Sequence, residues 1–310
     1  MTRHVLSMSD LSPEDVQAVL TLASAQALAP VLAGAGVALV FEHPSARTRN
    51  AAEMAVVQLG GHPVTIGAAE VGLDRRETVE DVARTLGSYH RVLGARVARH
   101  ATLERMAAAL DAAGREVPVV NLLSDREHPT QALADLLTIA QCAGGLKGRR
   151  VAYVGDANNV CRSLVDACAL AGVDVAVAAP PGYQLSADDL ARARALGGRV
   201  TQVTRPEEAA EGADVLYTDV WVSMGDEADA ERRRRDLGAY RIDEELLGRA
   251  APGAIVLHCL PAHRGEEVTA AVIDGERSRV WVQAENRMHA LRGLLAHLVG
   301  ADTAEAAGER

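Results

Sequence analysis

Hydroxyl and arginine side chains gather directly after a short apolar run in the first third of the chain. The segment reads Ser45, Ala46, Arg47, Thr48 and Arg49. At a helix start, free backbone N–H groups and the positive end of the helix dipole favour an anion, which the side chains of Ser45, Arg47 and Thr48 can surround. The same residues also fit an ordinary helix N-cap followed by surface arginines. The segment therefore indicates either a phosphate site or a plain helix start.

A histidine and a glutamine open the next segment that could do chemistry. His128 precedes Pro129, and Gln131 follows at the beginning of a long apolar helical pattern. A separation of three residues puts His128 and Gln131 on one helix face, where both can hydrogen-bond the same carbonyl and amide group. A single histidine before proline is more often a helix cap or a hydrogen-bonded core group, so this pair alone is a weak signal.

Polar residues also follow two apolar runs in the second half of the chain. Asn158 and Asn159 end one run, and Asp219, Ser223 and Met224 end another. In open parallel sheets, ligands bind outside the carboxyl ends of the strands, and a carboxylate such as Asp219 suits an ammonium group there. Asx-turn geometry alone would explain the asparagines. No GxGxxG pattern is present, so a dinucleotide-binding dehydrogenase is the least favoured reading.

The four cysteines differ in their surroundings. Cys259 stands beside His258 where an apolar run ends, which favours the edge of a polar cleft, although free cysteine is commonly a small buried hydrophobe. Cys161 and Cys168 lie on an apolar helix stripe and Cys142 lies near a helix end, so we expect all three to serve packing. The absence of a CxxC pair and of an apolar N-terminal signal core predicts a reduced, cytoplasmic protein.

Composition limits the possible partners. The chain has 310 residues, a net charge of -10, 3% aromatic residues and Lys147 as its one lysine. A nucleic-acid partner is disfavoured by the acidic charge and the scarcity of stacking rings. A P-loop or a Schiff-base enzyme needs a suitably placed lysine, which Lys147 in a polar turn does not supply. No apolar run approaches the roughly 18 to 20 residues that span a bilayer, so we expect no membrane partner.

Two groups of parallel strands are expected to position these residues. Short apolar runs alternate with helical patterns, which is typical of a doubly wound α/β sheet. The expected strands are 36–42, 62–68, 88–97 and 117–123 in the first group, and 149–156, 173–180, 199–204, 213–220 and 251–260 in the second.

A long helix over 130–145 is expected to join two doubly wound domains. The final apolar run, 279–283, reads as a strand followed by a C-terminal helix that packs back on the first domain, and the charged run at 231–238 reads as a solvated loop. The predicted domains are 1–140 together with 286–310, and 141–285.

In this order, the motifs resemble the aspartate/ornithine carbamoyltransferase family over nearly the whole chain. The family's Ser-Thr-Arg-Thr-Arg element is similar to residues 45–49, and its His-Pro-x-Gln element matches 128–131. The sequences WVSMG at 221–225 and HCLPAHRGEEV at 258–268 resemble the ornithine branch of the family rather than the aspartate branch.

The resemblance implies transfer of a carbamoyl group from carbamoyl phosphate to the δ-amine of L-ornithine, giving citrulline in arginine biosynthesis. It implies no metal or organic cofactor, and a homotrimer or a multiple of it. The implied catalytic residues are Arg96, His128 and Cys259; the implied carbamoyl-phosphate contacts are Ser45, Ala46, Arg47, Thr48, Arg96, His128, Gln131, Cys259, Leu260 and Arg287; and the implied ornithine contacts are Asn159, Asp219, Ser223 and Met224.

The clearest departure from the family pattern is Ala46, where a phosphate-binding hydroxyl is usual. A hydrogen bond to a charged group contributes about 1.5 to 3 kcal/mol, so its loss would weaken carbamoyl phosphate binding unless another donor compensates. Two alternatives stay open on this ground. One is a carbamoyltransferase paralogue acting on another amine or amino acid, and the other is a non-catalytic homologue with a weakened phosphate site.

Overall fold

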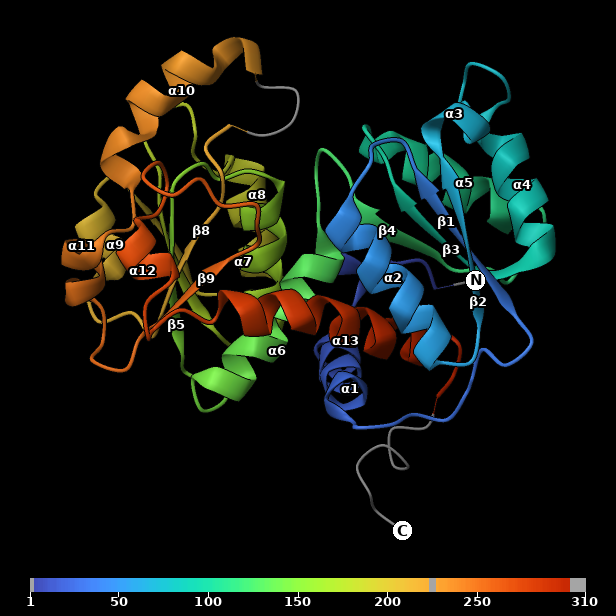
Figure 1. Cartoon of the computed structure of the whole chain (residues 1–310), viewed down its shortest axis with the longest axis horizontal. Coiled ribbons are helices and arrows are strands. Elements are labelled where there is room, and N and C mark those ends of the chain that lie inside the picture. The colour runs from blue at the N-terminus through green and yellow to red at the C-terminus, as the bar shows by residue number, and fades with distance from the viewer. Residues whose placement is uncertain (1–2, 223–226, 302–310) are drawn as a thin grey trace. The chain divides into compact units, whose positions relative to one another are not determined.

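The chain divides into two α/β units, each with its own parallel sheet. The computed structural model describes residues 3–222 and 227–301. Unit 1 comprises Met1–Ala134 and Arg287–Arg310, and unit 2 comprises Asp135–Asn286. Figure 1 labels the elements. Two helices, α6 and α13, contain the points at which the chain passes from one unit to the other.

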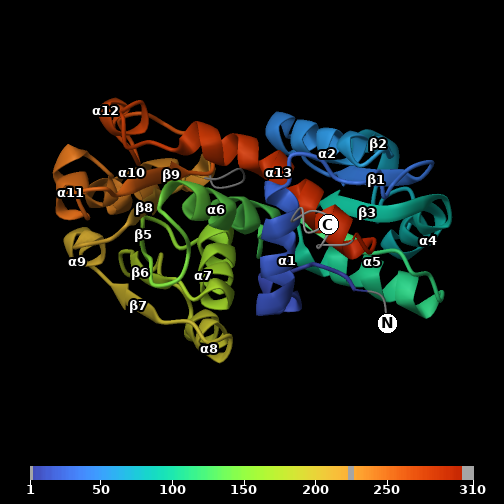
Figure 2. The same ribbon diagram turned by 90° about the horizontal axis from the view of Figure 1, so that it is seen from below.

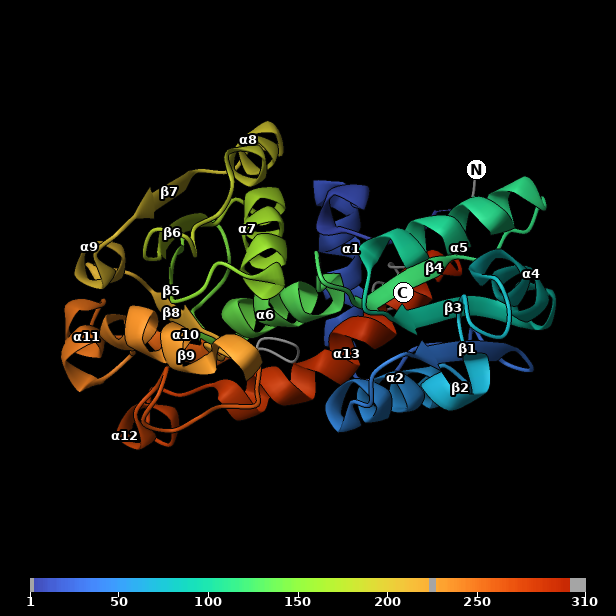
Figure 3. The same ribbon diagram turned by 90° about the horizontal axis from the view of Figure 1, so that it is seen from above.

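The sheet of unit 1 has four parallel strands in the order β2-β1-β3-β4. Residues 37–41 of β1 are all buried, as expected for a parallel strand covered on both faces. Helix α2 lies on one face of the sheet, and α4 and α5 lie on the other (Figures 2 and 3). The strands are β1 (Gly36–Phe41), β2 (His62–Gly67), β3 (His90–Arg96) and β4 (Val119–Leu123).

The helices of unit 1 begin at recognisable caps. Helix α1 starts with Pro13 after Ser12, whose hydroxyl accepts from the Asp15 N–H while Asp15 accepts in return from the Ser12 N–H. The helices of this unit are α1 (Pro13–Ser24), α2 (Ala46–Gln58), α3 (Ala68–Val71), α4 (Val79–Tyr89) and α5 (His100–Ala112).

The sheet of unit 2 has five parallel strands in the order β7-β6-β5-β8-β9. Helices α7 and α8 cover one face, and α9, α11 and α12 lie on the other (Figures 2 and 3). The strands are β5 (Arg150–Val154), β6 (Asp174–Ala178), β7 (Val200–Val203), β8 (Val215–Thr218) and β9 (Ile255–His258). The helices that lie wholly in this unit include α7 (Asn159–Ala171), α8 (Ala187–Ala195), α9 (Pro206–Ala210), α10 (Ala230–Leu237), α11 (Glu244–Arg249) and α12 (Ala270–Ile273).

The predicted doubly wound parallel fold is confirmed, and the predicted long helix is α6 (Pro129–Cys142). The expected packing of the C-terminal helix is also confirmed, because within unit 1 helix α13 lies against α1. The Arg292 guanidinium donates to the carbonyls of Ala23 and Ala25. A Cβ at Gly293 would stand 2.5 Å from the Val19 carbonyl oxygen, so only glycine permits this close approach.

The predicted strand at 279–283 is wrong, because these residues open helix α13 (Val280–Leu298). The alternation of apolar and polar residues there resembled a strand, yet the buried positions are Val280 and Gln283, three residues apart, and Trp281 is exposed. Spacing of three residues is helical. Inside unit 2, the side chain of Gln283 hydrogen-bonds Asp135 and His258, which accounts for its burial.

The predicted solvated loop at 231–238 is also wrong, because the run forms α10. One of its arginines is not solvated: the side chain of Arg233 is 11% exposed and pairs with Asp156. Arg233 also donates to the Trp221 carbonyl and lies 5.1 Å from the ring centroid of Tyr183. A run of charged residues predicts a solvated surface segment, and only the tertiary structure shows which of these charges has a partner.

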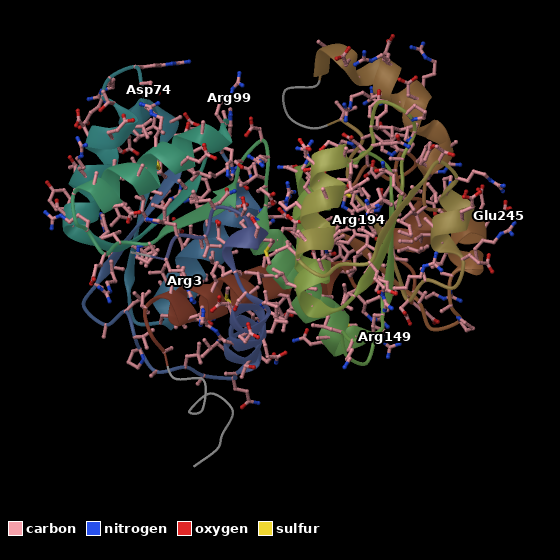
Figure 4. All side chains as sticks on the ribbon, turned by 180° about the vertical axis from the view of Figure 1, so that it is seen from behind. Arg3, Asp74, Arg99, Arg149, Arg194 and Glu245 are labelled. Carbon is pink, nitrogen blue, oxygen red and sulfur yellow. The ribbon has the colours of Figure 1, made fainter. Side chains whose placement is uncertain are left out.

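Charged side chains lie at the surface of both units. Charged side chains such as Asp74, Arg99, Arg194 and Glu245 are exposed at the surface (Figure 4). No helix in the described ranges is long and apolar enough to cross a membrane.

Candidate active site

The strand order of unit 1 places a topological switch point between β1 and β3, the position at which an open α/β sheet forms its crevice. The chain leaves β1 towards β2 on one side and reaches β3 on the other, so the connections after these neighbouring strands diverge. A carboxylate oxygen of Glu42, after β1, accepts from the Ala98 N–H, after β3, at 2.7 Å. The two connections are thereby tied at the position where an open α/β sheet binds its ligand.

Helix α2 begins in this crevice with the predicted phosphate segment. Ser45 is the N-cap, and its hydroxyl accepts from the Thr48 N–H at 3.3 Å. Thr48 is buried, and its Oγ1 accepts from Arg287 Nη2 at 2.7 Å and from Arg96 Nη1 at 3.5 Å. Arg47 is exposed. Ser45 is thus the N-cap of α2, its contact with phosphate stays a prediction, and two arginines distant in sequence converge on Thr48.

Positive charge and burial together shift the pKa values of this cluster. Burial and the charges of Arg287 and Arg47 lower the pKa of Arg96 to about 10. Burial, together with the charges of Arg287 and Arg96, holds the pKa of His128 well below its usual range, so its imidazole is neutral near pH 7. A bound phosphate would relieve the repulsion between the guanidiniums.

The carbonyl-binding candidates lie at the start of α6. His128 directly precedes the helix and is 4% exposed, and its Nδ1 lies 3.4 Å from Thr130 Oγ1. Gln131 is 1% exposed, and its backbone N–H donates to the His128 carbonyl. The two residues therefore lie in one buried turn at the start of α6, and their binding of a common ligand group stays a prediction.

Ala46 occupies the first turn of α2 and is exposed. It lines a cavity of about 720 Å³ in unit 1 together with Ser45 and Arg49, so space is available for a larger side chain. The remaining lining residues are Phe41, Glu42, Pro44, Asn50, Glu53, Thr65, Gly67, Ala68 and Glu70.

Unit 2 repeats the same construction with different side chains. Its crevice position, the topological switch point, lies between β5 and β8, and the residues after these strands meet: Asn158 Nδ2 donates to Asp219 Oδ2 at 2.7 Å. Asp219 Oδ1 accepts from the Val220 N–H at 2.8 Å and from Cys259 Sγ, after β9, at 2.8 Å. These contacts fix the carboxylate of Asp219 and place the thiol of Cys259 beside it.

The segment after β9 has an unusual backbone. Leu260 adopts φ of 60°, a left-handed conformation that non-glycine residues avoid, and such strain costs on the order of 1 to 3 kcal/mol. Its N–H donates to His258 Nδ1 at 2.9 Å. The opposite ring nitrogen of His258 lies 3.1 Å from Glu267 Oε1, and both side chains are almost fully buried.

The remaining predicted residues have the following places. Asn159 is the first residue of α7 and half-buried. Leu260 is half-buried after β9, and Cys259 is 8% exposed. Ser223 and Met224 lie outside the described residues. Cys161 and Cys168 are buried on α7 and Cys142 is half-buried at the end of α6.

A buried network that sequence reasoning missed supports this region from within unit 2. Gln283 Nε2 donates to Asp135 Oδ1 at 2.7 Å, and its Oε1 accepts from the His258 N–H at 2.8 Å. The Tyr217 hydroxyl donates to Asp135 Oδ2 at 3.1 Å. The sequence signal for this network was the presence of polar residues inside otherwise apolar helical patterns, because a buried polar group needs hydrogen-bonding partners.

Two side-chain groups in the described ranges resemble metal-ligand sets. In the first, Asp219, His258 and Cys259 offer ligand atoms within 4.8 Å of one another, and His263, Glu266 and Glu267 form the second. Both nitrogens of His258 already have hydrogen-bonding neighbours, so coordination by this ring would displace Leu260 or Glu267. The hydrogen bonds account for the first cluster without a metal.

Comparisons with known proteins agree across both units. The family model for the carbamoyl-P binding domain of aspartate/ornithine carbamoyltransferase matches residues 3–141, and the model for the Asp/Orn binding domain matches 147–298. The ornithine carbamoyltransferase of Acidothermus cellulolyticus is 49% identical over 97% of this chain and 98% of its own length.

Solved structures give the same result. The ornithine carbamoyltransferase of Thermus thermophilus has a TM-score of 0.86 and 44% identity, covering 97% of this chain and 100% of that one. The enzyme of Pyrococcus furiosus has a TM-score of 0.89 and 42% identity, covering 95% and 96%. The chain therefore belongs to the aspartate/ornithine carbamoyltransferase family.

Proposed function

We propose that this protein transfers the carbamoyl group of carbamoyl phosphate to the δ-amine of L-ornithine, giving L-citrulline and phosphate. The observation that carries the proposal is the convergence of Arg96 and Arg287 on the Thr48 hydroxyl at the start of α2. Two guanidiniums and a helix N-terminus form a site for a phosphate dianion. Full-length similarity to ornithine carbamoyltransferases supplies the acceptor.

In this proposal the residues of unit 1 bind carbamoyl phosphate. Ser45, Arg47, Thr48 and the α2 N-terminus hold the phosphate. Arg96, His128 and Gln131 donate to the carbamoyl group, and a donor aimed at the developing oxyanion lowers the barrier by about 3 kcal/mol. A neutral imidazole can serve as that donor without adding a fourth positive charge to the cluster, which is consistent with the lowered pKa of His128.

The residues of unit 2 bind the acceptor. Asp219 pairs with the α-ammonium of ornithine, Asn159 with its carboxylate end, and the thiol of Cys259 lies near the δ-amine. Ser223 and Met224 complete this set in the resemblance. The neutral δ-amine attacks the carbamoyl carbon, a C–N bond forms, the C–O bond to phosphate breaks, and the amine proton leaves with the phosphate.

Further properties follow from the family resemblance and are proposed with the reaction. We propose that Cys259, Leu260 and Ala46 also contact carbamoyl phosphate, that the domains are 1–140 with 286–310 and 141–285, and that the protein is a homotrimer or a multiple of it. We also propose a cytoplasmic role in arginine biosynthesis. Light scattering of the purified protein measures the oligomer, and a monomer would contradict the trimer.

The deciding experiment is a citrulline assay with carbamoyl phosphate and L-ornithine, run beside putrescine, lysine and aspartate as acceptors. We expect turnover with ornithine and none with aspartate. Turnover with another amine in preference to ornithine would move the protein to a different acceptor. If the wild type gave no turnover with any acceptor and Ala46→Thr restored turnover, the phosphate site of the wild type would have decayed.

A further inference from the structure

We infer that Glu267 is a positioning residue for Cys259 and acts through the imidazole of His258. The inference rests on the proposed function for its kinetic consequences, but its geometry lies entirely within unit 2. None of the roles implied by the resemblance falls on Glu267 or His258.

The carboxylate of Glu267 joins two points of the segment after β9. Its Oε1 accepts from the His263 N–H at 2.6 Å and lies 3.1 Å from His258 Nε2. Glu267 is fully buried, and its own backbone is fixed because its carbonyl accepts from the Ile242 N–H at 2.9 Å. The side chain therefore links residues 258 and 263 to a segment that is itself hydrogen-bonded to Ile242.

The hydrogen bonds specify the protonation of the ring. Leu260 N–H is a donor, so His258 Nδ1 must carry a lone pair rather than a proton. The remaining hydrogen of a neutral ring lies on Nε2, where it donates to Glu267 Oε1. Glu267 thus selects the one tautomer that can accept from Leu260.

Cys259 is the residue enclosed by this arrangement. The His258 side chain reaches over it to the Leu260 N–H, and the His258 N–H donates to Gln283 Oε1. The peptide unit that follows Cys259 and the peptide unit that precedes His258 are therefore both held by hydrogen bonds, and Leu260 has a left-handed φ of 60°. The direction of Cys259 Sγ towards Asp219, 2.8 Å away, follows from that backbone.

The test compares Glu267→Ala and Glu267→Gln with the wild type. Glu267→Gln keeps an acceptor oxygen for His258 and His263, and Glu267→Ala removes it. We expect kcat/KM for ornithine to fall about tenfold or more in Glu267→Ala, since small misplacements at a reacting centre are costly, and to recover in part in Glu267→Gln. Glu266→Ala is the matched control, because this neighbour pairs with Arg234 near the surface.

A readout that needs no turnover is the alkylation of Cys259 by iodoacetamide, followed by peptide mass spectrometry. Cys142, half-buried at the end of α6, is the internal reference in the same sample. Release of the Cys259 backbone should raise its rate relative to Cys142 in Glu267→Ala but not in Glu266→Ala. A merely structural role would lower the unfolding temperature without changing this ratio or the KM of the folded fraction.

A second pair of variants guards against misfolding of Glu267→Ala. In His258→Asn, the amide oxygen occupies the place of Nδ1 and can accept from Leu260 N–H. In His258→Gln, the amide reaches towards Glu267 but leaves Leu260 without its acceptor. We expect His258→Asn to retain more activity and a slower Cys259 alkylation than His258→Gln.

The inference is overturned if Glu267→Ala matches the wild type in both kcat/KM and alkylation ratio, or if His258→Gln equals or exceeds His258→Asn. A wild type that makes no citrulline would refute the proposed function instead. The alkylation ratios would then still decide whether Glu267 positions Cys259.

Discussion

The crevices of the two units share one topology and differ in charge. In each unit, the connections that follow two neighbouring strands run in opposite directions. These strands are β1 and β3 in unit 1 and β5 and β8 in unit 2. In unit 1 the crevice gathers Arg96 and Arg287 around Thr48. In unit 2 it gathers Asn158 and Cys259 around the carboxylate of Asp219.

Strand order determines where each site lies, and the side chains determine which ligand the site can bind. A parallel sheet presents the carboxyl ends of its strands at one edge whatever the sequence. The guanidiniums of unit 1 suit an anion, while the carboxylate of unit 2 suits an ammonium group. Variants that alter one crevice should therefore affect one substrate and leave the other unchanged.

The largest expected effect comes from removing a guanidinium of unit 1. Arg96→Met should lower kcat/KM by about a thousandfold, because it removes both phosphate charge and an oxyanion donor. Steady-state kinetics measure the loss, and Arg99→Met, which changes an exposed arginine three residues later, is the matched control. If Arg96→Met were no worse than Arg99→Met, Arg96 would not contact the reacting group.

Removing the charge of unit 2 should affect the other substrate. Asp219→Asn should raise KM for ornithine about 10- to 100-fold, the loss expected for a charged hydrogen bond. The dissociation constant of carbamoyl phosphate, measured by calorimetry, should stay unchanged. Asp188→Asn on the exposed face of α8 serves as the control. If the binding of both substrates weakened equally, the proposed assignment of carbamoyl phosphate to unit 1 and ornithine to unit 2 would be wrong.

A smaller effect should follow from restoring the missing hydroxyl. Ala46→Thr should lower KM for carbamoyl phosphate by about tenfold, because it adds one donor to a phosphate oxygen. Ala46→Val has nearly the same shape without the hydroxyl and should give no such gain. No difference between the two variants would mean that another donor already compensates for Ala46.

The smallest effect concerns the pH dependence of stability. The folded-state pKa of His128 is lowered by burial, Arg287 and Arg96, whereas an unfolded chain has the ordinary value near 6.5. Below that pH the unfolded state takes up a proton that the native state refuses, so the free energy of unfolding falls with decreasing pH by up to about 1.4 kcal/mol per unit.

His128→Asn should make this acid-side slope shallower by up to one proton, as measured by denaturant unfolding between pH 5 and 7, a window set roughly by the ordinary histidine pKa. His62→Asn, at an exposed histidine that begins β2, provides the comparison. An identical slope in His128→Asn and the wild type would show that His128 titrates normally in the folded state.

Much of the fold was predictable because parallel strands are locally encoded. Buried apolar runs such as 36–42 and 149–156 have the composition of strands covered on both faces, and they form β1 and β5. The run at 279–283 was mistaken for a strand because its alternation has the same local appearance. In the structure the run is helical and Gln283 is buried against Asp135, a contact between residues 148 apart in the chain that a short alternating run does not reveal.

The sequence by itself determined the types of chemical groups and their order: an arginine-rich helix start, His128 with Gln131, Asp219, and His258 with Cys259. It also placed each of them at the end of a strand or the start of a helix, because these are short-range properties.

Only the tertiary structure decided which groups act together. Thr48 and Arg287 are 239 residues apart in the chain, and Asp219 and Cys259 are 40 apart, yet each pair shares a hydrogen bond. Such contacts depend on strand order and helix packing, which join distant segments. The same packing buries Arg96 and His128 near other positive charges and shifts their pKa values, so the reactivity of the site belongs to the fold rather than to the motifs.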